Sequence, residues 1–178
     1  MEENKERMFV LPVDSSKHSE RAFDWYLKHI HRPGDRIGIV HIHEPPVLNH
    51  EAFGVLGKFY EKDEFQKALQ KSMNDSKSLV QKYEQKATSA GIESETIVKL
   101  NQHGAGHTIC DVAATKNADG IVMGSRGLNL FRRTLLGSVS SYVLNHANTT
   151  VTITPPENAH QHHLLAIPKD DTEISTIL

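Results

Sequence analysis

The stretch "MGSRGLNLFRRTLLGSVSSYV", residues 123–143, contains three glycines, three arginines and no carboxylate. The run "GIVMG" at 120–124 that leads into it has the length and composition of a buried β-strand. Apolar residues then recur at helical spacing from Val139 to Ala147. A strand, a glycine-bearing connection and a helix are therefore predicted in succession, which is the repeating unit of an α/β fold.

Outward from this unit, the same alternation of strand and helix runs along the chain. Strands are predicted at 9–13, 36–43, 93–100, 120–124 and 150–154. Helices are predicted within 14–30 and at 58–90, 108–117 and after Ser138. This pattern predicts an α/β fold with a five-stranded parallel sheet and helices on both faces, doubly wound and Rossmann-like. Ligands of such sheets bind beyond the carboxyl ends of the strands, where the strand order reverses.

The longest predicted helix has no glycine or proline from Lys58 to Ala90, and Gly91 is a natural stop. Its expected packing stripe consists of Phe65, Leu69, Met73, Ser76, Val80, Tyr83 and Ala87. The last residues, 155–178, mix prolines, histidines and acids without periodicity. We expect one domain over 1–154 and a flexible tail over 155–178.

The composition of the chain argues against nucleic acid and membranes as binding partners. The formal net charge is −2 over 178 residues, whereas nucleic-acid-binding domains are usually basic. No apolar run approaches the about 20 residues of a membrane span, and "MEENKERMF" lacks the apolar core of a signal peptide. Cys110 is the single cysteine and cannot form an internal disulfide. We expect a cytoplasmic protein that binds neither nucleic acid nor membrane.

The glycine-bearing stretch has the chemistry of a phosphate site. A side chain at Gly124 could keep a ligand from the backbone, and Gly127 permits a positive-φ turn that points N–H groups inward. Gly137 and Ser138 open a helix, whose free N–H groups and partial positive charge suit an anion. Further hydroxyl donors or positive charge come from Ser140, Arg126, Arg132 and Arg133. The alternative is structural, because glycines at strand ends are common and most surface arginines are simply solvated.

Asp14 follows the first predicted strand and is a second candidate. Its carboxylate could accept a ribose hydroxyl or help to hold Mg²⁺. Alternatively, it could cap the next helix or form an Asx turn.

The chain resembles the universal stress protein family from about Met8 to Thr154. The nucleotide-binding branch of that family has the signature Gly, two residues, Gly, nine residues, Gly, then Ser or Thr. Here Gly124, Gly127, Gly137 and Ser138 match it with the spacing intact. The stretches "LPVDSSKHSERAF", "IVHIHEP" and "GIVMGSRG" are also similar to the family.

The resemblance implies a five-stranded parallel fold that binds ATP or AMP, with Mg²⁺ accompanying ATP. By position, Pro12, Val13 and Asp14 would lie against the adenosine, and Ile42 would meet the adenine edge through its backbone. Met123 and Gly124 would flank the ribose and phosphates. Gly127, Gly137, Ser138, Val139 and Ser140 would hold the phosphates. Arg126 is added to this candidate nucleotide site for its positive charge, not by the resemblance. The implied role is a stress-response sensor or switch with at most slow ATP hydrolysis and no assigned catalytic residue.

Family members often form homodimers by pairing their last strands, and we expect a homodimer. Here the last strand reads "NTTVTITPP", with threonines alternating against Val151 and Ile153, and this composition leaves the dimer mode open. The loop "HGAGHT" replaces an acidic-proline sequence that many relatives carry before the third helix.

Other functions remain as alternatives. An ATP hydrolase or adenylyl-transfer enzyme would usually carry glycines after the first strand, where this chain has "VDSSKHS". A ligand-free dimeric interaction module is the third reading. His41 and His43 lie two apart on a strand and should face the same side, but no set of four zinc ligands accompanies them. The stretch "GSVSS" is not the G-x-S-x-G elbow of a serine hydrolase.

Overall fold

The computed structural model describes residues 6–46, 57–125 and 136–155. Its strands are β1 (Met8–Pro12), β2 (Arg36–His43), β3 (Glu93–Leu100), β4 (Gly120–Gly124) and β5 (Thr150–Thr154). Its helices are α1 (Lys17–His29), α2 (Gly57–Ser89), α3 (Ala105–Thr115) and α4 (Ser138–His146). The predicted alternation of strands and helices is confirmed.

All strand pairs are parallel, and the order across the five-stranded sheet is β3-β2-β1-β4-β5. Residues of β1 pair with β2 on one side and with β4 on the other, so that Val10 lies between Gly38 and Ile121. The winding direction reverses between β1 and β4. The doubly wound fold class is therefore confirmed, and the switch point falls between the two loops that the sequence singles out.

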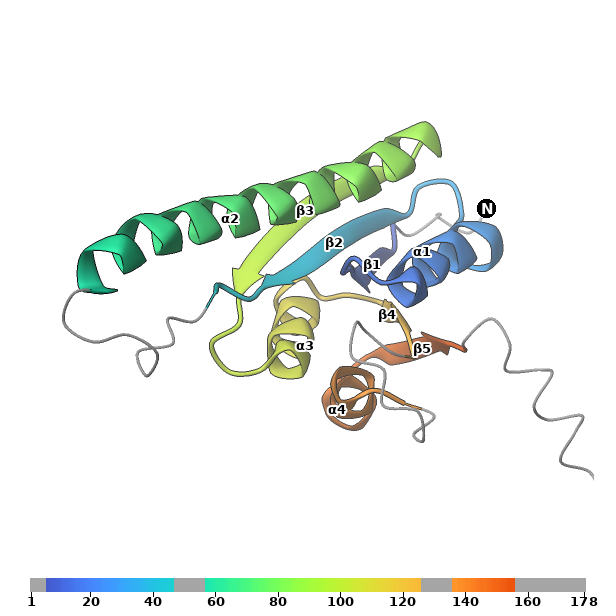
Figure 1. Ribbon diagram of the computed structural model, residues 1–178. Helices are drawn as coiled ribbons and strands as arrows, with labels where there is room; N and C mark the ends of the chain where they lie inside the picture. Colours follow the sequence, from blue (N-terminus) through green and yellow to red (C-terminus); the bar gives the residue numbers. More distant parts are fainter. Residues whose placement is uncertain (1–5, 47–56, 126–135, 156–178) are drawn as a thin grey trace, which may run out of the picture.

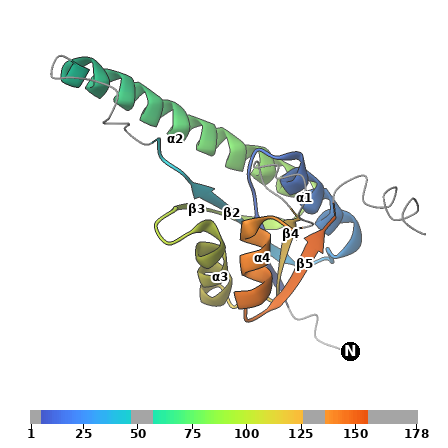
Figure 2. The same cartoon turned by 60° about the horizontal axis from the view of Figure 1, so that its bottom comes forward.

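Helices cover both faces of the sheet. In Figure 1, α1 and α2 lie on one side and α3 and α4 on the other, and Figure 2 shows α3 beside α4. Alternate residues of β1 enter different cores: Phe9 and Leu11 pack under α1 and α2, whereas Val10 packs under α3. None of the helices in the described ranges is long and apolar enough to cross a membrane.

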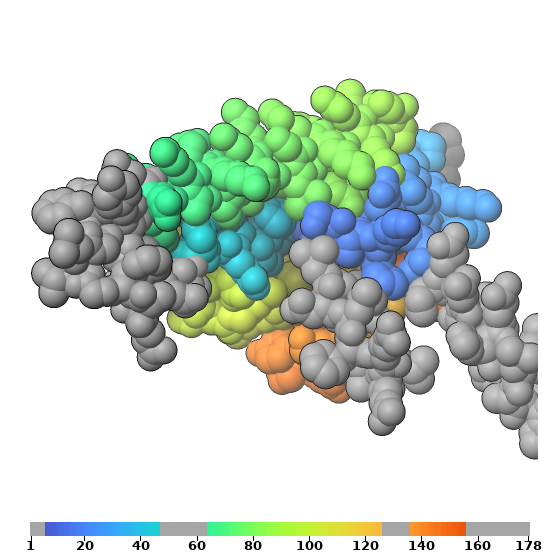
Figure 3. All heavy atoms as spheres, in the orientation of Figure 1, coloured from blue at the N-terminus to red at the C-terminus, as the bar shows by residue number. Residues whose placement is uncertain are grey.

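The long helix α2 is only partly packed on the sheet. Val80, Tyr83 and Ala87 are buried as predicted, but Met73 is 54% exposed, so its place in the packing stripe was wrong. A helix of 33 residues extends about 50 Å, whereas a strand of eight residues extends about 26 Å. The early part of α2 therefore projects past the sheet, as the ribbon shows in Figure 1. In Figure 3 the green spheres of α2 run along the top of the molecule.

Some boundaries differ from the sequence prediction. The first strand is Met8–Pro12, one residue earlier than predicted, and α3 begins at Ala105 rather than at residue 108. Gly104 starts α3 with a φ of 94°, and its N–H donates to Asn101 Oδ1 at 3.0 Å. The Asn101 side chain thus accepts the N–H of Gly104 at the start of α3, in the loop "HGAGHT" that differs from the family pattern. The expectations for the tail beyond Pro155, and for Arg132 and Arg133, concern residues outside the described ranges.

Candidate nucleotide site at the sheet's switch point

A pocket of about 440 Å³ opens at the carboxyl ends of β1, β2 and β4. It is lined by these predicted site residues: Pro12, Val13, Asp14, Ile42, Met123, Gly124, Gly137, Ser138, Val139 and Ser140. The two other candidates, Arg126 and Gly127, lie outside the described residues. The fold thus brings together two segments that are more than a hundred residues apart in the sequence.

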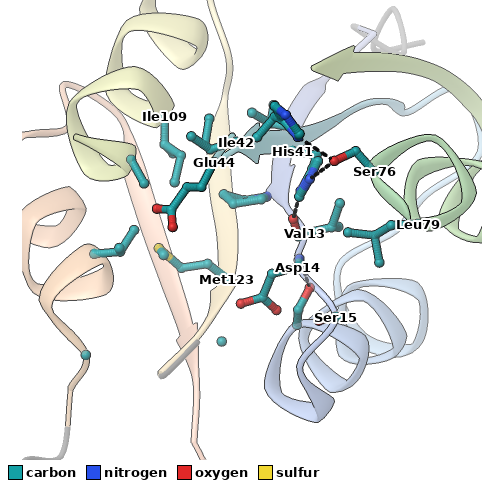
Figure 4. Close-up of a pocket in the computed structure, with 18 of the residues that line it drawn as sticks. Val13, Asp14, Ser15, His41, Ile42, Glu44, Ser76, Leu79, Ile109 and Met123 are labelled. Atoms are coloured by element: carbon teal, nitrogen blue, oxygen red, sulfur yellow. Dashed lines mark hydrogen bonds between the residues drawn. The ribbon is translucent and has the colours of Figure 1, made fainter. Parts of the chain in front are cut away.

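The loop after β1 is fixed by hydrogen bonds on both sides of Asp14. The Val13 N–H donates to the Val40 carbonyl at 2.8 Å, and the Asp14 N–H donates to Ser19 Oγ at 3.0 Å. Asp14 Oδ1 accepts the Ser16 N–H at 2.9 Å, which is the Asx turn anticipated as the structural role. The turn holds the carboxylate so that it points into the opening between β1 and β4 (Figure 4). Asp14 therefore orders its own loop while it lines the pocket.

The N-terminus of α4 forms the opposite wall. Gly137 precedes the helix with ordinary extended backbone and contributes no side-chain cap. Its own N–H donates to the Ser125 carbonyl at 2.7 Å, which ties the start of α4 to the end of β4. The first amides of a helix have no partner within the helix, so those of Ser138 and Val139 are suited to an anion in the pocket.

Ser140 has a different environment from the one expected of a phosphate donor. It is buried, and its Oγ lies 2.9 Å from the Ser125 carbonyl and 3.0 Å from the Gly137 carbonyl. A hydroxyl has one proton, and here it is directed at main-chain acceptors. In this structure Ser140 fixes the connection between β4 and α4.

Gly124 lines the pocket and also has a packing reason to be glycine. A Cβ placed on it would lie 2.7 Å from the His18 carbonyl oxygen, in the first turn of α1. This spacing is shorter than real Cβ contacts allow, and the neighbour is backbone. The absent Cβ of Gly124 thus permits the close approach of α1 to β4, and the room that it leaves for a ligand stays a prediction.

Two histidines and a serine that line the pocket are joined by hydrogen bonds, and Figure 4 labels two of them, His41 and Ser76. His41 Nδ1 lies 3.0 Å from the Val13 carbonyl, and His41 Nε2 lies 3.1 Å from Ser76 Oγ. His43 Nδ1 lies 2.7 Å from the same Ser76 oxygen. A carbonyl can only accept, so His41 carries a proton on Nδ1; in that tautomer of the neutral ring, Nε2 accepts the Ser76 proton. Ser76 then accepts from His43, and the network joins α2 to β2 and to the loop after β1.

This network explains why two histidines lie on one face of β2. Within the described ranges, no group of three or more histidine, cysteine, aspartate or glutamate residues is placed to hold a metal ion. The serine was visible in the sequence as the one polar member of the α2 packing stripe. Its hydrogen bonds to both histidines could not be predicted from the sequence.

The pocket also has lining residues that sequence reasoning missed. They come from the loop after β1, from β2 and its end, and from α1, α2 and α3: Ser15, Ser19, Val40, His41, His43, Glu44, Ser72, Asp75, Ser76, Leu79, Ala105 and Ile109. Glu44 is held by Asn101, whose Nδ2 donates to Glu44 Oε1 at 2.9 Å. Ser72, Ser76 and Leu79 are spaced along one face of α2, but only Ser76 belonged to the packing stripe predicted from the sequence.

Comparison with known proteins identifies the family. A sequence profile described as "Universal stress protein family" matches residues 7–155. This chain belongs to the universal stress protein family. The match spans every strand and helix described above.

Individual universal stress proteins are similar over different lengths. The chain is 29% identical over 151 residues to universal stress protein Sll1654 of Synechocystis sp., covering 84% of this chain and 85% of that protein. It is 34% identical to universal stress protein Sll1388 of the same organism, but over 85 residues. That shorter match covers 48% of this chain and about half, 54%, of the relative.

Solved structures share the fold. The hypothetical protein MJ0577 superposes with a TM-score of 0.70 at 18% identity, covering 86% of this chain and 98% of that one. A universal stress protein family protein from Arabidopsis thaliana, solved with AMP bound, gives a TM-score of 0.56 at 22% identity, covering 86% and 94%. A universal stress protein solved in complex with cAMP gives 0.53 at 25% identity, covering 83% and 96%.

Proposed function

We propose that this universal stress protein binds an adenine nucleotide, AMP or ATP, in the pocket at the switch point and acts as a ligand-dependent sensor or switch in the cytoplasm. The observation that carries the proposal is the convergence of a carboxylate and an uncapped helix N-terminus on one pocket. Asp14 approaches from β1, and the first amides of α4 approach from the other side. A ribose hydroxyl can donate to the carboxylate, and a phosphate can accept from the helix amides. One nucleotide carries both groups.

We assign the residues on each side of the pocket to one part of the nucleotide. Asp14 accepts a ribose hydroxyl, and Ile42 offers backbone groups to the edge of the base beside Val13. Pro12 and Met123 supply apolar contact, while Ser138 and Val139 donate to phosphate oxygens. Gly127 belongs to the proposal through the glycine signature alone, and Arg126 through its positive charge alone. The AMP and cAMP of two structural relatives support an adenine nucleotide as the ligand class, although not these residue roles.

Mg²⁺ would enter with ATP. Magnesium is usually held by phosphates and by one or two carboxylates, while several waters stay bound to it. Asp14 and Glu44 are carboxylates that line the pocket and suit this arrangement. When bound, Mg²⁺ would neutralise phosphate charge. We assign no residue to catalysis and propose that any hydrolysis is slow, so that occupancy of the pocket is the signal.

Calorimetric titration of the full chain with AMP, ATP plus Mg²⁺, cAMP and GMP tests the proposal. The informative variant is Asp14→Asn, because an asparagine oxygen can still accept the Ser16 N–H and keep the turn. Losing a charge-assisted hydrogen bond of about 1.5–3 kcal/mol should weaken AMP binding by about ten- to a hundredfold. Asp111→Asn, an exposed change on α3, is the matched control and should bind as the parent does.

Two results would contradict the proposal. One is the absence of heat or thermal stabilisation with every adenine nucleotide at millimolar concentration. The other is binding that Asp14→Asn and Asp111→Asn affect equally, which would place the ligand elsewhere.

A further inference from the structure

The helix α2 is held to the rest of the molecule differently along its length. In its later part, Val80, Tyr83 and Ala87 are buried. In the stretch 64–79, by contrast, no side chain is buried. Between described residues, the hydrogen bonds of Ser76 to two histidines of β2 are the only ones that join this stretch to another element. Leu79, at the end of the stretch, is partly buried and packs against the core.

A helical stretch with so few contacts outside itself opens locally at a low free-energy cost. Isolated helices shorter than about 12–15 residues are marginal in water, and most helical stability in proteins comes from the packing of an apolar face. Segments with few buried apolar contacts accordingly lie at the low-stability end of a structure. The stretch 64–79 is therefore the part of α2 whose order a new contact can change most.

The same stretch of α2 is one wall of the pocket. Ser72, Asp75, Ser76 and Leu79 line the pocket, and their spacing of three and four places them along one face of the helix. Figure 4 shows Ser76 and Leu79 reaching from α2 toward Val13. The walls at the end of β1 and the start of α4 are tied to β2 and to the residue after β4 by main-chain hydrogen bonds. A ligand that fills the pocket would thus touch firmly held walls and one weakly held wall.

We propose that a nucleotide in the pocket orders the stretch 64–79 of α2, so that the projecting part of this helix reports whether the pocket is occupied. The inference rests on the proposed function, which supplies the occupant. Leu79 gives apolar contact to the base, while Ser72 and Asp75 accept from donors such as the exocyclic amine of adenine. None of these three residues belongs to the glycine signature or to the site residues that the family resemblance implies.

The size of the effect follows from mass action. A ligand that touches the stretch binds its ordered form, and it lowers the population of the open form by the factor 1 + [L]/Kd. At a hundred times Kd this factor is about a hundredfold, and amide exchange that proceeds through local opening slows equally. Helix ends that do not touch the pocket keep their own opening equilibrium.

Hydrogen exchange of the full chain, followed by mass spectrometry, tests the proposal with AMP at about a hundred times the Kd found by calorimetry. Peptides within 64–79 should exchange about ten- to a hundredfold more slowly. Peptides within 24–29, at the end of α1 and outside the pocket, should change by less than about twofold. Binding that leaves 64–79 unchanged, or that slows α1 equally, would overturn this inference alone. Absence of AMP binding would overturn the proposed function with it.

Two double variants identify the contacts on α2. Ser72→Ala with Asp75→Ala should still bind AMP through Asp14 and the start of α4, but about tenfold more weakly. At matched occupancy, the slowing of exchange in 64–79 should fall by about fivefold or more, because the ligand has lost its polar partners on the helix. Asn74→Ala with Ser78→Ala changes exposed residues of the same helix outside the pocket and should behave as the parent does. Slowing equal to the parent's in both double variants would refute the role of this wall.

Discussion

At the residue scale, Gly124 connects the packing of the fold to the pocket. It ends β4 as a lining residue, and its missing Cβ leaves space for the His18 carbonyl of α1. Gly124→Ala forces backbone against a methyl group, and overpacking of this kind typically costs about 1–3 kcal/mol. We expect the free energy of unfolding, measured by urea titration, to fall by about that amount.

Gly38→Ala provides the matched comparison for Gly124→Ala. Its Cβ would meet Met8 Cε at 3.1 Å, which is the end of a flexible side chain, so the loss should be smaller. If the two variants lost equal stability, the close contact between α1 and β4 would not be the reason that position 124 is glycine.

At the scale of elements, the attachment of α2 to the sheet depends on Ser76. Its hydroxyl bonds to both His41 and His43, and His43 is buried. Ser76→Ala leaves ring nitrogens without this partner, at a cost of about 1–3 kcal/mol for unsatisfied buried groups. Chemical denaturation should reveal this loss. Ser78→Ala, at an exposed position of the same helix, should leave stability within about 0.5 kcal/mol of the parent.

Ser76→Ala should also loosen the loop after β1, which lines the pocket. His41 also contacts the Val13 carbonyl, which precedes Asp14 in the loop after β1. A stability loss for Ser76→Ala no larger than that for Ser78→Ala would show that the network contributes little to holding α2 in place.

At the scale of the whole molecule, a partly buried ion pair lies at the margin of the sheet opposite the pocket. Arg7 Nη2 lies 2.7 Å from Asp35 Oδ2, the Arg32 N–H donates to the same oxygen at 2.8 Å, and Asp35 is 5% exposed. Burial alone would raise the pKa of Asp35 and is the largest single influence. The hydrogen bonds from Arg7 and the Arg32 amide, with the Arg7 and His31 charges, together outweigh it and lower that pKa below 3.8.

The lowered pKa fixes the sign of the pH dependence. A carboxylate with a depressed folded pKa stabilises the protein above its unfolded pKa, and this contribution is lost as the pH falls through the folded pKa. We expect the free energy of unfolding to decline as the pH drops from about 5 toward 2, and Asp35→Asn to flatten that decline. An unchanged acid limb in Asp35→Asn, with Asp111→Asn as the reference, would exclude Asp35 as a cause.

The sequence by itself determined the alternation of elements, most strand boundaries and the glycine signature, because these depend on residues close together in the chain. Side-chain periodicity, helix caps and turn residues act locally, so the strand over 36–43 and the stop at Gly91 could be predicted. Only the tertiary structure decided that β1 lies beside β4, that Ser76 reaches two histidines, and that Gly124 faces α1. These contacts join residues far apart in the chain, and their geometry is set by how the helices pack on the sheet rather than by any local pattern.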